Sequence, residues 1–227
     1  PPFLVASAEA WDAARQELTD LSGNGRAGRL LSGTIDVGVV QGHGASIRVP
    51  YVGGASSSEL QWDAGTIPPT FTVCSITRYS SEDTGVQKRI LDSSDLNWLH
   101  GHYGGVSEYT PRPGDGQPAA GVAFYNSWIG SSAQPASVSS STDWVVMCGR
   151  NVASAGSIST IVNGATQSVG EGGTGNCRLG INSWGGDASD WQLSKVYVWD
   201  GHLPDAVFAQ ASQSLNDYLA GTLAAPG

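Results

Sequence analysis

The sequence is poor in charged residues, and above all in lysine. Only 14% of its 227 residues are charged, Lys88 and Lys195 are its lysines, and the formal net charge is −9. A negative chain repels phosphate backbones and anionic lipid surfaces, so we expect no nucleic-acid partner. No stretch approaches the ~20 consecutive apolar residues of a membrane helix, so we expect no membrane span. Neutral polar residues must cover much of the surface.

Cysteine is scarce as well. Cys74, Cys148 and Cys177 form an odd set, so at most one intramolecular disulfide is possible and all three pairings remain open. Cys74 and Cys148 lie in apolar, strand-like runs, where a cysteine commonly packs as a small buried hydrophobe; this favours free thiols. Because no Cys-x-x-Cys pair occurs, we do not expect structural zinc.

The sequence also lacks the acid pair of a retaining glycosidase, whose two carboxyl groups lie ~5–5.5 Å apart. The nearest imitation is Glu59 and Asp63, which an extended strand would separate by about 13 Å. No Gly-x-Ser-x-Gly nucleophile motif is present either. We therefore predict that the chain is not an enzyme.

Short alternating segments separated by turn residues occupy most of the chain. They predict an all-β fold, a two-sheet antiparallel β-sandwich of the jelly-roll type. Asn163-Gly164 is typical of a hairpin turn. We expect an entry strand and an irregular segment within 3–18, a structural turn at 22–25, and strands at 47–51, 59–63, 70–79, 87–91, 96–105, 121–128, 143–150, 157–162, 166–169, 177–181 and 191–199.

The end of the chain has a different period. Apolar residues recur at steps of three and four from Val207 to Leu219, which predicts a short amphipathic helix that ends near Gly221. We expect a single domain over 1–222, with 223–227 as a tail or the start of a linker. Because the chain begins with Pro1 rather than Met, we expect a processed chain or part of a larger multidomain protein or assembly.

Three segments carry a family resemblance: "DLSGNGR" at 20–26 after an early Trp11, the Trp-led "WVVMCGRN" at 144–151 before the Asn-Gly hairpin, and "SKVYVWDGHLPDAVFAQASQSLNDYL" at 194–219. They resemble the concanavalin A-like lectin/glucanase superfamily, in particular its laminin G-like members. The resemblance implies a concanavalin A-like sandwich with a glycan- or protein-binding surface, secreted to the extracellular space or the cell wall. It also implies calcium at a loop rim.

Sugar binding requires flat aromatic rings beside hydrogen-bonding groups. The segments that combine the two give the predicted ligand-binding residues Trp98, His100, His102, Tyr103, Tyr125, Asn126, Trp128, Asn182 and Trp184. For 98–103 the alternative is core packing, because sandwich cores also use Trp. His100 and His102 lack a third ligand nearby, so we do not expect them to chelate a metal.

The candidate calcium ligands are Asp187 and Asp190, since hard cations prefer carboxylate and carbonyl oxygens. In a glycine-rich loop the same residues also serve as ordinary turn formers.

The sequence thus predicts a non-catalytic, extracellular recognition module that binds a glycan or another protein chain through an aromatic-rich surface. One alternative is a structural subunit of a larger assembly. The other is a glycoside hydrolase or lyase with an atypical site.

Overall fold

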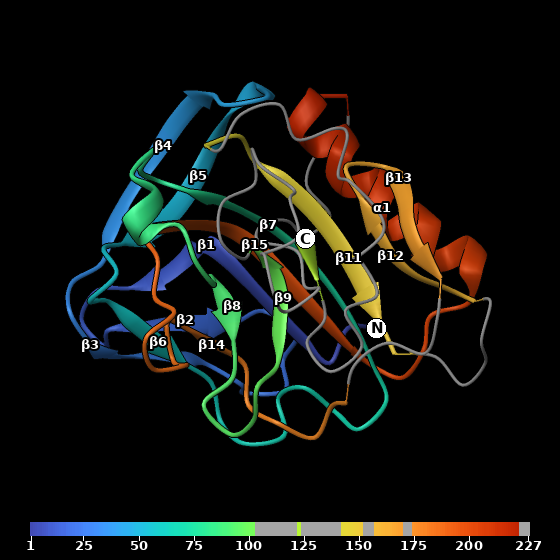
Figure 1. Cartoon of the computed structure of the whole chain (residues 1–227), viewed down its shortest axis with the longest axis horizontal. Coiled ribbons are helices and arrows are strands. Elements are labelled where there is room, and N and C mark those ends of the chain that lie inside the picture. Colours follow the sequence, from blue (N-terminus) through green and yellow to red (C-terminus); the bar gives the residue numbers. More distant parts are fainter. Residues whose placement is uncertain (103–121, 124–141, 152–156, 170–173, 223–227) are drawn as a thin grey trace, which may run out of the picture.

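The computed structural model describes residues 1–102, 122–123, 142–151, 157–169 and 174–222. These residues form antiparallel strands and one α-helix, as the sequence predicts (Figure 1). In chain order the elements are β1 (Leu4–Asp12), β2 (Glu17–Asp20), β3 (Gly28–Ser32), β4 (Asp36–Gly42), β5 (Ala45–Gly54), β6 (Glu59–Gln61), β7 (Phe71–Tyr79), the 3-10 turn η1 (Thr84–Val86), β8 (Leu91–Asp92), β9 (Leu99–His102), β10 (Val122–Ala123), β11 (Val145–Arg150), β12 (Ile158–Val162), β13 (Ala165–Val169), β14 (Gly180–Ile181), β15 (Trp191–Asp200) and α1 (Asp205–Ala220).

The strands make one continuous sheet that folds over into two layers. Its order is β10-β9-β8-β14-β6-β3-β2-β1-β15-β7-β11-β12-β13, and the β4–β5 hairpin joins at β15. In Figure 1 the short strands β8, β9 and β14 lie in front of β1, β15, β7 and β11. The largest apolar cluster lies between the layers and includes Trp62, Trp98 and Trp191, each at most 1% exposed. This is the core that alternation along the strands predicts.

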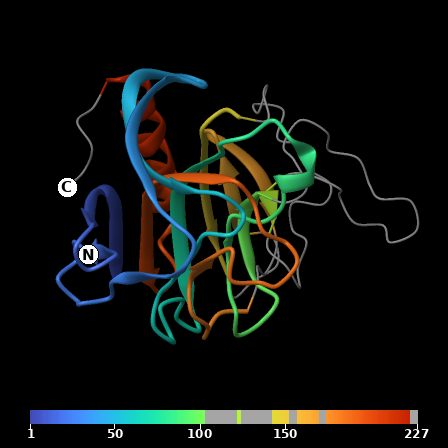
Figure 2. The same ribbon diagram turned by 90° about the vertical axis from the view of Figure 1, so that its left-hand side faces the viewer.

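Helix α1 covers the outer face of the rear layer, on the side away from β8 and β9 (Figure 2). Phe208, Leu215 and Leu219 of α1 join a second apolar cluster with Ile76 and Val146 of the sheet. Because both faces of β7 are covered, every residue of that strand is buried. The helix ends where Gly221 adopts φ 75° and its N–H caps the last turn, as the sequence predicts.

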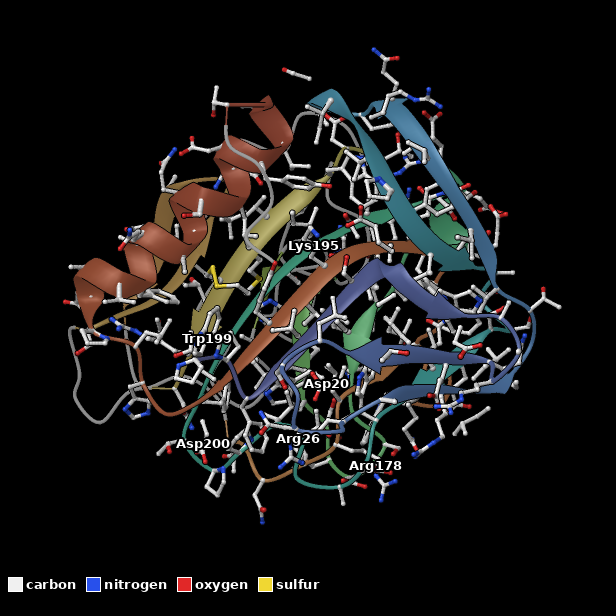
Figure 3. The ribbon with its side chains drawn as sticks, turned by 180° about the vertical axis from the view of Figure 1, so that it is seen from behind. Asp20, Arg26, Arg178, Lys195, Trp199 and Asp200 are labelled. Carbon is white, nitrogen blue, oxygen red and sulfur yellow. A yellow bond between two sulfur atoms is a disulfide. The ribbon has the colours of Figure 1, made fainter. Side chains whose placement is uncertain are left out.

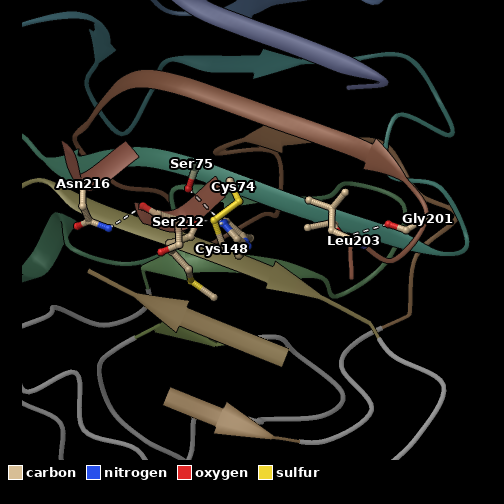
Figure 4. Close-up of a disulfide and its surroundings, with 10 residues drawn as sticks. Cys74, Ser75, Cys148, Gly201, Leu203, Ser212 and Asn216 are labelled. Carbon is tan, nitrogen blue, oxygen red and sulfur yellow. Dashed lines mark hydrogen bonds between the residues drawn. A yellow bond between two sulfur atoms is a disulfide. The ribbon is translucent and has the colours of Figure 1, made fainter. Parts of the chain in front are cut away.

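The free-thiol interpretation of Cys74 and Cys148 is wrong. The two residues lie directly opposite each other on β7 and β11 and form a disulfide. It lies beneath α1, next to Ser212 (Figure 4). Both strands are apolar enough to suit a buried thiol, so only the register between them reveals the pair. Cys177 is the cysteine left over, and it is buried.

The turn at 22–25 is structural, as predicted, and the buried Asp20 organises it. Its carboxylate accepts hydrogen bonds from the backbone N–H groups of Val5, Ser22 and Arg26 and from the Ser22 hydroxyl. Burial of the carboxyl acts to raise its pKa, but these hydrogen bonds outweigh it and the pKa of Asp20 is lowered. Asp20 and Arg26 lie side by side at this corner in Figure 3.

Several local expectations need correction. The irregular segment within 3–18 is the hairpin of β1 and β2, and the strand expected at 87–91 is largely the connection between η1 and β8. The hairpin turn at Asn163-Gly164 is confirmed, with φ 47° and 81°. Strands β3 and β4 were not predicted, because glycine and exposed apolar residues obscure their alternation.

Strand β15 contains a bulge that changes which residues face the core. Its pairing with β7 shifts between Leu193 and Lys195, so two residues of β15 span one step of β7. Before the bulge, Trp191 and Leu193 face the inter-sheet core, and after it Val196 and Val198 do. As a result Tyr197 and Trp199 join the α1 side. Among the described residues no helix is both long and apolar enough to cross a membrane.

Candidate functional site

A polar pocket of about 370 Å³ opens at the end of the sandwich where β15 begins. The β4–β5 hairpin forms one wall, and the loop after β7 contributes Ser80. The side chains that give it chemical character are Asp36, Asp190 and Gln192. Thr34, Ile35 and Trp191 and the backbone of Gly53, Gly54 and Ala55 complete its lining.

Gln192 is the most constrained polar group in this pocket. It is 8% exposed, and its Oε1 accepts a hydrogen bond from Nε of Arg78 at 2.6 Å. Arg78 is itself buried and donates from a second nitrogen to the carbonyl of Thr142 at 2.7 Å. The NH₂ group of Gln192 makes no hydrogen bond within the described part of the chain. The side chain therefore enters the pocket with its acceptor used and two donors available.

Two carboxylates supply acceptors to the same pocket. The Tyr51 hydroxyl donates to Oδ2 of Asp36 at 2.7 Å, and this bond, with burial, raises the pKa of Tyr51. The backbone N–H of Ser56 donates to Oδ1 of Asp190 at 2.7 Å. In each case the other carboxylate oxygen receives no hydrogen bond from the described residues. Both acids are held in place while one oxygen stays available to a ligand.

Close backbone approach shapes the wall between them. A Cβ on Gly53 would lie 2.7 Å from the carbonyl oxygen of Trp191, and one on Gly54 would lie 2.5 Å from Cβ of Ser58. Only glycine allows β5 to pack this closely against its neighbours. These two glycines therefore set the position of the wall.

The loop 182–190 borders this pocket and contains four predicted site residues. Buried Asp92 anchors the loop, because its carboxylate accepts hydrogen bonds from the backbone of Ser183 and Trp184 and from the Ser183 hydroxyl. Desolvation of that carboxyl raises the pKa of Asp92 despite these bonds. The loop thus has a fixed path on the rim.

Within this loop the predicted residues take different roles. The Asn182 amide donates to the carbonyls of Ser58 and Ser189 and accepts from Ser189 N–H, so it connects two loops. Trp184 is partly exposed, and the Arg89 guanidinium lies 5.4 Å from its ring centre. Trp184 therefore presents a partly exposed ring on this loop, outside the lining of the polar pocket.

The proposed calcium ligands are bonded to protein groups in this structure. Asp187 pairs with Nε of Arg89 at 3.1 Å, and Asp190 holds Ser56 as described above. Among the described residues no three His, Cys, Asp or Glu side chains are arranged to hold a metal. Calcium at this rim stays a prediction.

A second hollow adjoins the rim beyond Asp190. It has a volume of about 320 Å³ and is lined by Ser56, Ser57, Gly85, Val86, Lys88, Gly186 and Ala188. Nζ of Lys88 donates to the carbonyl of Gly186 at 2.8 Å. Three loops, 55–58, 80–89 and 182–190, therefore meet at this end of the sandwich.

The predicted residues on β9 lie elsewhere. Trp98, His100 and His102 are each 0% exposed. His100 stacks on Trp98 and contacts Ser75 at 3.2 Å, while His102 contacts Thr77 at 3.3 Å and packs edge-on against Tyr79. Loss of hydration lowers the pKa of both histidines to about 3. The surface placement expected for these three residues is corrected to core packing, because β9 faces β7 across the sandwich. Tyr103, Tyr125, Asn126 and Trp128 lie outside the described residues.

A different surface holds another partly exposed aromatic ring. Trp199 is partly exposed and stacks on Tyr197 at 5.9 Å, in a groove of about 320 Å³ between β15 and α1. Val207, 44% exposed, Gln210 and Ser214 form the helix side. Figure 3 shows Trp199 near the end of β15, beside Asp200.

Sequence reasoning missed Asp36, Tyr51 and Gln192. Asp36 is the first residue of an unpredicted strand, and Gln192 occupies a position in β15 that alternation marks only as polar. The one usable signal was a glutamine beside two apolar strand residues. Nothing in the sequence pairs it with Arg78, which lies 114 positions earlier.

No protein-family model matches this chain. No curated protein matches it either. Solved structures do share its fold at low identity. Domain 4 of AbnA, a GH43 extracellular arabinanase from Geobacillus stearothermophilus, in complex with arabinotriose, gives a TM-score of 0.56 at 13% identity, over 93% of this chain and 98% of that chain.

Botulinum neurotoxin binding domains are also similar. That of botulinum neurotoxin DC in complex with SialylT gives a TM-score of 0.57 at 10% identity, over 94% of this chain and 51% of that chain. The same domain in complex with rat synaptotagmin II gives 0.52 at 12% identity, again over 94% and 51%. This chain thus spans about half the length of those domains. At these identities the likeness shows a shared all-β sandwich fold.

Proposed function

We propose that this chain is a non-catalytic recognition module that binds carbohydrate in the polar pocket at the start of β15. The observation that carries the proposal is Gln192. Its side chain is 8% exposed, is held by Arg78, and offers two donors to a pocket that two oriented carboxylates also line. Sugar hydroxyls both donate and accept, so they match such a mixed set of groups. Trp184, on the loop that leads to Asp190, has a partly exposed ring for stacking on a glycan that extends beyond the pocket.

Similar structures support this proposal by analogy. One solved neighbour is in complex with arabinotriose, and another is in complex with SialylT. The absence from the sequence of a glycosidase-type acid pair favours binding over cleavage. The Cys74–Cys148 disulfide favours an oxidising compartment, in keeping with an extracellular or cell-wall module.

The test uses the isosteric variant Gln192→Glu. Glutamate keeps the acceptor for Arg78, so the fold should survive, but it replaces the ligand-facing donor with an acceptor. We expect affinity for neutral oligosaccharides, identified on a glycan array and measured by calorimetry, to fall about tenfold or more. Gln41→Glu makes the same change at an exposed position on β4 and should have no effect. Equal loss in both variants, or no retention of any glycan, would contradict the proposal.

A second candidate function is binding of a protein partner. The groove at Trp199 and Val207 favours it, because aromatic and aliphatic side chains are commonly buried at protein interfaces. One solved neighbour is in complex with rat synaptotagmin II. Trp199→Ala would weaken such an interaction and leave glycan binding intact, whereas Gln192→Glu would do the reverse.

A further inference from the structure

The polar pocket is negative. Asp36 and Asp190 line it, and no lysine or arginine among the residues that the structure describes does so. Arg78 stands behind Gln192 at 5% exposure, with two of its donors used by Gln192 and Thr142. Lys88 belongs to the neighbouring hollow and is bonded to Gly186. A ligand in the pocket therefore meets two acidic groups directly, whereas the charged Arg78 is buried and bonded to the Gln192 amide.

The number of hydrogen-bond donors that the two carboxylates can accept indicates which ligand groups suit the pocket. Each carboxylate has one oxygen occupied by a protein donor and one oxygen available, and a carboxylate can only accept. A sugar hydroxyl brings one donor, whereas an ammonium group brings three and a positive charge. Hydrogen bonds between charged partners are roughly twice as strong as neutral ones. The NH₂ of Gln192 can serve a neighbouring ring hydroxyl or ring oxygen.

We infer that the pocket prefers glycans that carry an unsubstituted amino group, over their N-acetylated and acidic counterparts. This inference rests on the proposed function and narrows it to a ligand class. N-acetylation removes the charge and two of the three donors of the amino group. A uronate or sulfate would place a third negative charge beside Asp36 and Asp190, which like-charge repulsion opposes.

Two substitutions test the carboxylates while keeping the protein bonds that hold them. Asp36→Asn retains an acceptor for the Tyr51 hydroxyl, and Asp190→Asn retains one for Ser56 N–H, so both variants should fold. Asp200→Asn removes the same charge from an exposed position at the other end of β15 and is the matched control. Thermal unfolding of all three variants checks that the fold is unchanged.

The measurement is calorimetric titration with glucosamine tetramer, N-acetylglucosamine tetramer and tetragalacturonate. We expect the wild-type chain to bind the amino form at least tenfold more tightly than the acetylated form, with affinity that falls as salt rises. The acidic oligomer should not bind. Asp36→Asn and Asp190→Asn should each reduce the preference severalfold, and Asp200→Asn should leave it unchanged. Tetralysine, which has ammonium groups but no sugar ring, should bind no better than the acetylated tetramer.

The outcomes separate the two proposals. If neutral glycans bind through Gln192 but the amino form has no advantage, this inference fails and the proposed function stands. If the preference persists in both Asp variants, or tetralysine binds as tightly as the amino form, net charge explains the attraction and the inference fails. If no glycan of any class binds, the proposed function fails as well.

Discussion

Two polar clusters in this sandwich are buried to nearly the same degree but differ in access. His100 and His102 are sealed between β9 and β7, each 0% exposed, and their contacts are protein groups. Gln192 is only slightly more exposed, at 8%, yet it lines an open pocket. The sealed cluster can affect only the stability of the fold, because side chains that are 0% exposed offer no surface to a ligand. The open one can bind. Burial fixes the geometry in both, and access decides which of them can act on another molecule.

The largest expected effect is the loss of stability that acid causes through the two histidines of the sealed cluster. The pKa of both histidines is lowered to about 3, so below their ordinary value of 6.5 the unfolded chain takes up protons that the folded chain does not. This stabilisation is fully present above pH 6.5 and is lost as pH falls toward 3. Each histidine should contribute a slope of about 1.4 kcal/mol per pH unit. Urea unfolding from pH 7 to pH 4.5 measures it.

His100→Gln and His102→Gln should each reduce that slope by about half. NMR of the wild-type imidazoles provides an independent readout, since neither buried ring should titrate near pH 6.5 in the native state. A native-state transition of either ring between pH 6 and 7 would place it in contact with water. The contrast between the two clusters would then disappear.

Removing the disulfide under α1 should weaken the fold without changing the pocket, which sharpens the comparison. It links residues 74 positions apart, so replacing Cys74 and Cys148 together by Ala should lower the free energy of unfolding by about 4 kcal/mol. Guanidinium unfolding measures the loss, and glycan affinity should remain unchanged while the chain is folded. Thiol titration of the denatured, unreduced protein should find one thiol, that of Cys177. Three reactive thiols would contradict the pairing.

The smallest effect is expected at the far end of β15. Trp199→Ala removes a half-buried ring that stacks on Tyr197, so it should cost about 1 kcal/mol of stability. Glycan affinity in the polar pocket should stay within twofold of the wild-type value by calorimetry. If glycan affinity fell as far as in Gln192→Glu, the Trp199 groove would be the sugar site. The assignment of binding to the open polar pocket would be wrong.

Much of the scaffold could be predicted from the sequence because its signals are local. Alternation identified β5, β7, β11 and β15, and the three- and four-residue steps identified α1 with its end at Gly221. The candidate site could not be predicted in the same way. The sequence leaves Trp98, His100 and His102 open between a binding surface and the core, and only the packing of the two layers shows that they are buried.

The sequence by itself determined that this protein is an antiparallel all-β chain with a C-terminal helix. The two-residue period of strands and the ~3.6-residue period of helices are both visible among neighbouring residues. The tertiary structure alone decided which polar residues meet. Register placed Cys74 opposite Cys148, and the β15 bulge turned Tyr197 and Trp199 toward α1. Packing brought Gln192 to Arg78 and Asp36 to the same pocket. These contacts span tens to more than a hundred residues, and a local pattern carries no information about such distances.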